Sequence, residues 1–183
     1  MRLAVATNNP GKLDEIARVL GASFELVPRP SIPEPVEDGG TLVANARIKA
    51  VAVVGATGLP AVADDTGLFV DALDGGPGVE TAHFGGWEAL LPVLADVVDR
   101  RAVFRTVAMV VWPDGREVVV EGEAEGTIAL APRGSHGWGY DPVFVPSDGD
   151  GRTFAEMPKP EKDALSHRGR AFRALADALS RQV

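Results

Sequence analysis

The sequence predicts a mixed α/β fold in which a central sheet carries flanking helices. In its first third, short apolar runs typical of buried strands alternate with segments whose apolar residues recur at helical spacing. Past the middle of the chain, strand-like runs follow one another across short turns, which predicts antiparallel neighbours added to the first sheet. The 183 residues suit one ordinary domain, or two small lobes that share a sheet.

The chain begins with a strand, a polar loop and a helix. Residues 3–6 are apolar, the run Thr7-Asn8-Asn9-Pro10-Gly11-Lys12 is dense in turn formers, and residues 13–20 have helical spacing, with Gly21 as a stop. Such a unit directs backbone N–H groups and the positive end of the helix toward a ligand above the loop, most naturally a phosphate. Lys12 opposes the helix dipole, which suggests that it faces a ligand. The P-loop pattern is absent.

A strand, an extended proline-rich loop and a helix are predicted next, over residues 24–27, 28–35 and 42–54. Thr41 is a suitable N-cap for this helix, and Gly55 and Gly58 are expected to end it. Asn45 and Lys49 share one helix face because they are four residues apart. From spacing alone, we expect that Lys49 lies on a solvated surface.

The most informative run is Ala63-Asp64-Asp65-Thr66-Gly67-Leu68, which follows a small apolar stretch. Neighbouring carboxylates at a strand end repel each other unless a cation neutralises them, so the pair is a reasonable site for a hard divalent ion. Gly67 is expected to let the backbone turn sharply behind the acids. The alternative is a solvated acidic turn, which is the better interpretation of an isolated Asp-Asp pair.

The remaining elements are predicted as scaffold. They are a tight turn at 75–78, a helix over 89–98, strands over 103–111, 117–121 and 123–128, a capping-box sequence at 153–156, and a C-terminal helix lined by Phe172, Leu175, Ala176 and Leu179.

The loop 134–142 is a second candidate ligand site. Three glycines interleaved with Trp138 and Tyr140 form poor secondary structure but a good flat platform for a ring. The alternative is a core aromatic cluster at a sheet edge, although packing alone would not need the glycines. Farther along, hydrogen-bond donors that suit keto oxygens or phosphates gather near a helix start: Lys162, Ser166, His167 and Arg168.

Composition limits the classes of function. A hydrophobic fraction of 45% and a charged fraction of 24% are typical of a soluble globular protein. The absence of cysteine excludes disulfides, thiolate metal sites and a cysteine nucleophile. A net charge of −8 argues against a nucleic-acid partner, and no stretch has the apolar length of a membrane span. We therefore expect a cytoplasmic protein that binds neither nucleic acid nor membrane.

Five runs, in order along nearly the whole chain, resemble the inosine triphosphate pyrophosphatase family. They are Thr7 to Lys12; Glu37-Asp38-Gly39 with Asn45-Ala46 and Lys49-Ala50; Ala63 to Leu68; Gly137-Trp138-Gly139-Tyr140-Asp141-Pro142; and Thr153-Phe154-Ala155-Glu156-Met157 through Lys162 to Ser166-His167-Arg168.

The resemblance implies an elongated fold, one domain over 1–183, in which two lobes enclose an active-site cleft, and a homodimer. It implies Mg²⁺-dependent hydrolysis of the nucleoside triphosphates ITP, dITP and XTP to the monophosphate and pyrophosphate. Asp65 would be the general base and a metal ligand, with Glu37 and Asp64 as the other metal-site carboxylates. The substrate would be bound by Thr7, Asn8, Asn9, Pro10, Gly11, Lys12, Lys49 and Thr66 on its triphosphate side and by Trp138, Gly139, Tyr140, Asp141, Lys162, Ser166, His167 and Arg168 around its base.

Two alternatives stay open at this point. One is a Maf-like pyrophosphatase that acts on pyrimidine or modified nucleotides. The other is a nucleotide-binding sensor without catalysis, against which the intact carboxylates argue, because a pure binder would not need them beside a triphosphate.

Overall fold

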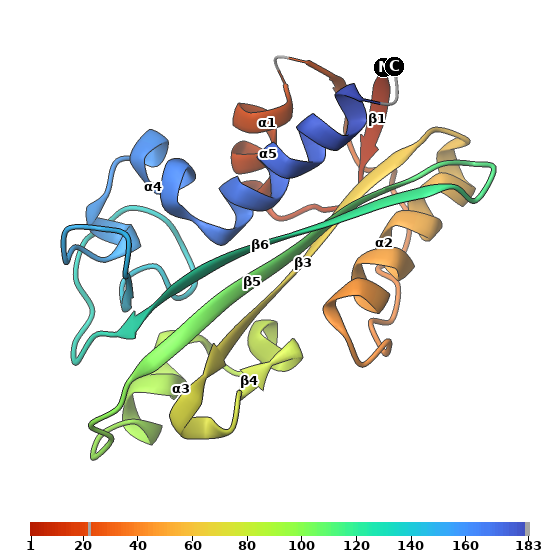
Figure 1. Ribbon diagram of the computed structural model, residues 1–183. Coiled ribbons are helices and arrows are strands. Elements are labelled where there is room, and N and C mark those ends of the chain that lie inside the picture. The colour runs from red at the N-terminus through yellow and green to blue at the C-terminus, as the bar shows by residue number, and fades with distance from the viewer. Residues whose placement is uncertain (22, 182–183) are drawn as a thin grey trace. The chain divides into compact units, whose positions relative to one another are not determined.

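The computed structural model describes residues 1–21 and 23–181 and confirms the mixed α/β fold (Figure 1). The described strands form one open, seven-stranded sheet in the order β2-β1-β3-β5-β6-β7, with β4 paired to β3. The strands are β1 (Arg2–Val5), β2 (Glu25–Val27), β3 (Ala61–Val70), β4 (Pro77–Gly78), β5 (Arg101–Val111), β6 (Glu117–Ile128) and β7 (Phe144–Pro146). The helices are α1 (Pro10–Leu20), α2 (Leu42–Thr57), α3 (Gly86–Val93), α4 (Lys159–Leu165) and α5 (His167–Ser180).

The chain forms two compact units that share three strands. The first unit comprises residues 1–65, 106–122 and 171–183, and the second comprises 66–105 and 123–170. The chain passes from one unit to the other within β3, between Asp65 and Thr66. The single domain and the active-site cleft expected from the family resemblance remain predictions.

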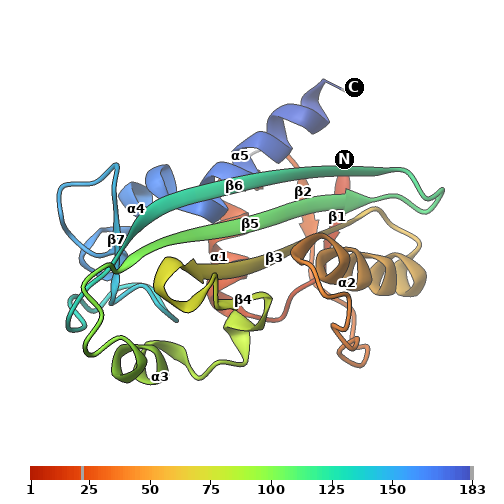
Figure 2. The ribbon, with the colours of Figure 1, turned by 60° about the horizontal axis from the view of Figure 1, so that its bottom comes forward.

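In the first unit, helices cover both faces of the sheet. Helices α1 and α5 lie on one face and α2 on the other (Figure 2). The apolar cluster on the α1 and α5 face contains Ile16, Leu20, Phe172, Leu175 and Leu179, packed against strand residues. The predicted apolar stripe of the C-terminal helix is therefore confirmed.

Of the predicted helix ends of this unit, those at Gly21, Thr41 and Gly58 are present, whereas the one at Gly55 is wrong because α2 runs on to Thr57. Asn9 caps α1, and the Thr41 side chain accepts a hydrogen bond from the Ala44 N–H at the start of α2. Helix α2 continues through Gly55 and ends at Gly58, whose φ of 65° lies in the left-handed region that glycine tolerates.

In the second unit, the core lies around Phe104, Phe144 and Phe154. The predicted capping box joins Thr153 and Glu156.

Residues 117–121 and 123–128, which were predicted as separate runs, form the single strand β6. They are continuous because alternate residues from Gly122 to Ile128 are buried, which keeps one face of the strand on the core.

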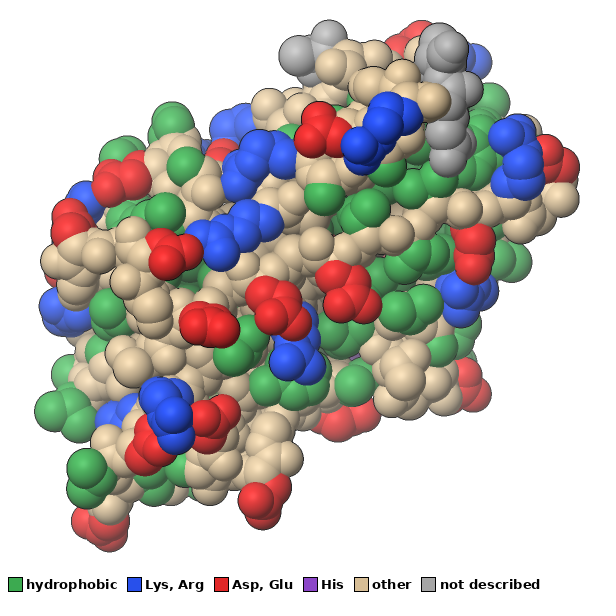
Figure 3. Space-filling view, in the orientation of Figure 1, with side chains coloured by type: hydrophobic (Ala, Val, Ile, Leu, Met, Phe, Trp, Pro, Cys, Tyr) green, Lys and Arg blue, Asp and Glu red, His purple; other side chains and the backbone are tan. Residues whose placement is uncertain are grey.

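Figure 3 shows acidic and basic side chains interspersed over one face of the molecule. No helix within the described residues is long and apolar enough to cross a membrane.

Gly67 does not form the sharp turn that the sequence suggested, because it lies inside β3. A Cβ at this position would come within 2.7 Å of the Gly78 carbonyl oxygen and 2.8 Å of the Phe69 ring. Strand β4 pairs with β3 here, with Leu68 opposite Gly78. Glycine is thus required for the close approach of two strands.

We predict that Gly67→Ala lowers the free energy of unfolding by about 1–3 kcal/mol through overpacking. Gly55→Ala is the matched control, because a Cβ there meets nothing within 4 Å and the residue lies in a helix, so stability should rise by about 0.5–1 kcal/mol. Urea unfolding followed by circular dichroism measures both. Equal stability of the two variants would contradict the steric argument.

Candidate active site

The register of two parallel strands brings the polar loop after β1 beside the acidic run within β3. Val5 of β1 pairs with Val62 of β3, and the Ala6 N–H donates to the Val62 carbonyl oxygen. Thr7, two residues after Val5, therefore lies just past the end of β1 at the level of Asp64, which is inside β3.

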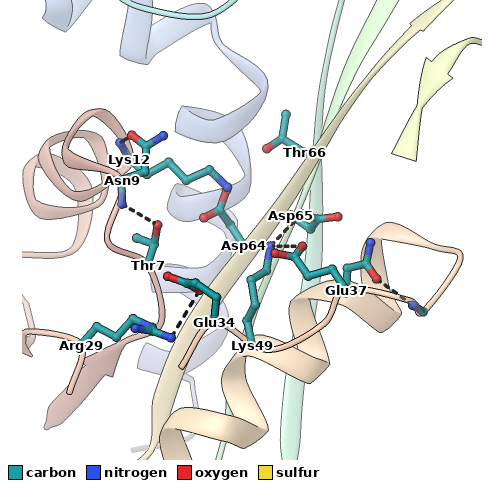
Figure 4. Close-up of polar contacts among 12 residues, drawn as sticks. Thr7, Asn9, Lys12, Arg29, Glu34, Glu37, Lys49, Asp64, Asp65 and Thr66 are labelled. Carbon is teal, nitrogen blue, oxygen red and sulfur yellow. Dashed lines mark hydrogen bonds and ion pairs between the residues drawn. The ribbon is translucent and has the colours of Figure 1, made fainter. Parts of the chain in front are cut away.

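Asp64 and Asp65 belong to strand β3, so their side chains point to opposite faces of the sheet (Figure 4). Each carboxylate meets its own lysine. Lys12 Nζ lies 3.0 Å from Asp64 Oδ2, and Lys49 Nζ lies 2.7 Å from Asp65 Oδ1. Both aspartates are buried, so the alternative of a solvated acidic turn is wrong. The two negative charges are neutralised by cations from α1 and α2.

Lys49 is buried instead of solvated, contrary to the prediction from spacing alone. Its Nζ bridges Asp65 and Glu37, at 2.7 and 2.9 Å. Burial lowers the pKa of Lys49, but the charges of Asp65 and Asp64 and the hydrogen bonds that Lys49 donates to Asp65 and Glu37 outweigh it and raise the pKa overall. Burial raises the pKa of Asp65, and Lys49 reverses this only in part. Lys49 is therefore charged, and Asp65 is more basic than an ordinary aspartate.

The polar loop after β1 is organised largely by its own side chains. Asn9 Oδ1 accepts hydrogen bonds from the N–H groups of Gly11 and Lys12, at 2.9 and 3.2 Å. The Asn9 N–H in turn donates to Thr7 Oγ1. Two of the helix N–H groups that were expected to face a ligand therefore donate to the N-cap side chain instead. The side-chain amide of Asn8 donates to Glu34 Oε1 at 3.1 Å.

The carboxylates in this region suit a hard divalent cation, since oxygen ligands are what such ions prefer. Glu37 and Asp65 already share one cationic group, the Lys49 ammonium. Within the described residues, however, no three histidine or acidic side chains form a preformed metal-binding group. Asp64 faces the other side of β3 with Lys12. Of the three predicted carboxylates, Glu37 and Asp65 thus share one cation, and the role of all three as metal ligands stays a prediction.

The second set of predicted residues lies in the second unit and is built around Trp138. This side chain is 36% exposed, with the Arg168 guanidinium 5.1 Å and the Lys162 ammonium 6.0 Å from its ring centroid. Asp141 Oδ2 accepts hydrogen bonds from Lys162 Nζ and the Trp138 N–H, at 2.6 and 2.8 Å. An exposed aromatic face between two cations can hold a planar ring.

Glycine at 137 is needed for this arrangement. Its φ is 75°, and a Cβ there would come within 2.0 Å of the Asp141 carboxylate. Gly139 also has a positive φ, of 61°. The positive φ angles of Gly137 and Gly139 explain why the loop has glycine at these two positions, which aromatic packing alone would not need.

The structure separates the two aromatic residues of this loop. Tyr140 lies in the core, where its ring meets Phe104 edge-on and its hydroxyl donates to the Thr81 carbonyl oxygen. For Tyr140, the alternative of a core aromatic is the arrangement observed, whereas Trp138 lies at the surface. Burial raises the pKa of Tyr140.

Ser166, His167 and Arg168 are all buried and make different contacts. Ser166 Oγ accepts a hydrogen bond from the Gly169 N–H, and the His167 ring stacks on Phe104 with centroids 4.3 Å apart. Arg168 donates to Thr66 Oγ1 at 3.1 Å, a contact within the second unit. Arg168 thus contacts both Thr66 and the ring of the exposed Trp138.

Three residues near the carboxylates were not predicted as functional. Asn45 Oδ1 accepts a hydrogen bond from the Gly39 N–H, and its signals in the sequence were its helical spacing from Lys49 and its place in the second of the five matching runs. Arg29 and Glu34, which contact each other in the proline-rich segment, carried no signal in the sequence.

Comparison with known proteins extends over the whole chain. Residues 3–178 match the sequence model of the Ham1 family. A protein of Corynebacterium efficiens named dITP/XTP pyrophosphatase is 46% identical, covering 98% of both chains. The solved Ham1 protein of Coxiella burnetii is 38% identical with a TM-score of 0.88 over 99% of both chains. A nucleoside-triphosphatase / dITP/XTP pyrophosphatase of Mycobacterium abscessus is 46% identical with a TM-score of 0.74, covering 96% of this chain and 98% of that one.

We predict that Lys12→Met lowers the free energy of unfolding by roughly 3 kcal/mol, because it removes the cation beside a carboxylate that is 1% exposed. The double variant Lys12→Met/Asp64→Asn should recover most of this loss. A double-mutant cycle in urea measures the coupling energy. Additive losses would contradict the pairing of these two side chains.

Proposed function

Because this chain belongs to the Ham1 family, we propose that it hydrolyses the triphosphates of non-standard purines, namely ITP, dITP and XTP, to the monophosphate and pyrophosphate. Relatives that share about 45% identity over nearly their full length are named dITP/XTP pyrophosphatases. The observation in the structure that supports the chemistry best is the buried lysine that bridges Glu37 and Asp65. It holds two carboxylates and a cation together beside β3.

In the proposed reaction, a water molecule attacks the α-phosphorus of the triphosphate. The bond from this phosphorus to the oxygen that bridges to the β-phosphate breaks, and pyrophosphate leaves. Asp65 accepts the proton of the water, a role that suits a carboxylate whose pKa is raised by burial. Lys12 and Lys49 bind the phosphate charge that develops on the leaving group. The polar loop from Thr7 to Lys12 orients the triphosphate.

Glu37 and Asp65 would hold a magnesium ion. Such an ion, when bound, neutralises charge on the departing pyrophosphate and helps ionise the attacking water. We also propose that the protein is a cytoplasmic homodimer and that residues 1–183 act as one domain. These proposals follow the family resemblance.

The second set of residues is proposed to bind the base. Trp138 offers its exposed face to the purine ring, while Lys162 and Arg168 donate hydrogen bonds to the 6-keto group. His167, Ser166 and Asp141 would complete the pocket edge with Gly139, and the buried Tyr140 would support it from the core. Adenine carries an amino group at position 6, so it would present a donor to these donors. Each mismatched buried polar group costs roughly 1–3 kcal/mol, which corresponds to about a ten- to hundredfold preference.

We predict that the purified protein with Mg²⁺ converts ITP, dITP and XTP to the monophosphate and pyrophosphate at least about tenfold more efficiently than ATP. Ion-exchange chromatography of the nucleotide products, together with pyrophosphate detection, measures kcat/KM for each substrate. The panel includes dTTP and UTP. Faster hydrolysis of either would favour the Maf-like alternative, and binding of ITP without turnover would favour a sensor.

We predict that Asp65→Asn lowers kcat by about 10²–10⁴-fold because the general base is lost. Nucleotide binding, measured by calorimetry, should persist. Asp14→Asn is the matched control, since Asp14 is a half-exposed partner of Arg18 on α1, and its kcat should be unchanged. Near-normal turnover of Asp65→Asn would contradict the assignment of the base.

A further inference from the structure

Glu37 lies on a segment that has no helix or strand of its own. Residues 28–41 connect β2 to α2 without regular secondary structure, and four prolines stiffen the part before Glu37. Such a segment lacks the backbone hydrogen bonds of a helix or strand, so it can hold a carboxylate in a defined position only if other contacts take their place. The contacts that do so come from its two ends. We refer to residues 29–39 as the strap.

At the first end, Arg29 closes the strap on itself. Its side chain is 4% exposed, and its guanidinium donates to the carbonyl oxygens of Ile32 and Pro33, both at 3.0 Å, and to Glu34 Oε2 at 3.3 Å. A buried guanidinium needs such acceptors, and its planar fork reaches several of them at once. The backbone that leads to Glu37 is thus shaped around one buried cation.

Two further contacts attach the strap to its neighbours. Glu34 Oε1 accepts a hydrogen bond from the amide of Asn8, in the polar loop after β1. At the other end, the Gly39 N–H donates to Asn45 Oδ1 at 2.9 Å. Asn45 lies on the same face of α2 as Lys49, one helical turn earlier, and Lys49 holds the Glu37 carboxylate. Glu37 therefore lies between two fixed points.

We propose that Arg29 is a positioning residue for Glu37, and through it for the divalent cation that Glu37 and Asp65 would bind. The proposal rests on the metal site of the proposed function. Arg29 touches neither the cation nor the substrate. Its effect is to keep the strap folded, so that the Glu37 carboxylate faces Asp65 without an entropic cost when a cation binds.

The test uses Mn²⁺ alone as the probe, with the full chain and no nucleotide. Free Mn²⁺ is measured by electron paramagnetic resonance during titration of the wild type, Arg29→Gln and Glu37→Gln. Loss of a residue that orients a metal ligand typically weakens affinity by about 10–100-fold. We therefore expect that the Kd of Arg29→Gln for Mn²⁺ rises about tenfold. With ITP as substrate, its kcat should recover when Mg²⁺ is raised, while KM for ITP stays unchanged.

Arg47→Gln is the matched control. Arg47 lies in the same unit and makes a double hydrogen bond to Glu117 at the surface, away from the strap, so its Mn²⁺ affinity should equal that of the wild type. Arg29→Lys is a milder substitution, because it keeps the positive charge of the side chain. Its single ammonium cannot replace the fork, so its Kd should lie between those of the wild type and Arg29→Gln. It replaces Arg29→Gln if that variant does not fold.

The outcomes separate the two proposals. If Glu37→Gln weakens Mn²⁺ binding but a folded Arg29 variant does not, the positioning role is overturned and the metal site stands. If the wild type and Glu37→Gln do not differ in Mn²⁺ binding, the metal assignment fails and the positioning role fails with it. Hydrolysis of ITP is judged by the separate substrate panel.

Discussion

The alternation of side chains along β3 is the constraint on which the candidate site depends. Two consecutive aspartates in a strand cannot face the same side, so each needs its own counter-charge. Lys12 supplies one from α1, and Lys49 supplies the other from α2. Since α1 and α2 lie on opposite faces of the sheet, the Asp-Asp pair is the point where both helices are tied electrostatically to the strand between them.

The same constraint divides the chemistry. Asp65 faces α2, where Lys49 and Glu37 share its charge, and burial makes it a better base than an exposed aspartate. Asp64 faces α1 and holds the lysine that follows the polar loop. The two faces of β3 thus carry different charged groups, with Lys49, Asp65 and Glu37 on one and Lys12 and Asp64 on the other.

Residues that carry no obvious chemical role shape both sets of side chains. Arg29 and Asn45 hold the irregular strap that bears Glu37. In the second unit, Gly137 admits the Asp141 carboxylate beneath Trp138, and Tyr140 fixes its loop to the Thr81 carbonyl oxygen. Glycine and a buried tyrosine act here through space and packing, which is why their importance appears only when their neighbours are known.

The alternation of strands and helices and the caps at Thr41 and Thr153 could be predicted from the amino-acid sequence, because these features depend on residues close together in the chain. Four features follow from the folded arrangement instead: Lys49 is buried, Asp64 and Asp65 face opposite sides of β3, Tyr140 lies in the core while Trp138 is exposed, and Arg29 is buried against the segment that leads to Glu37. Helical spacing says which residues share a face but not what covers that face. Burial of a charge depends on partners brought from distant segments, and no local pattern specifies them.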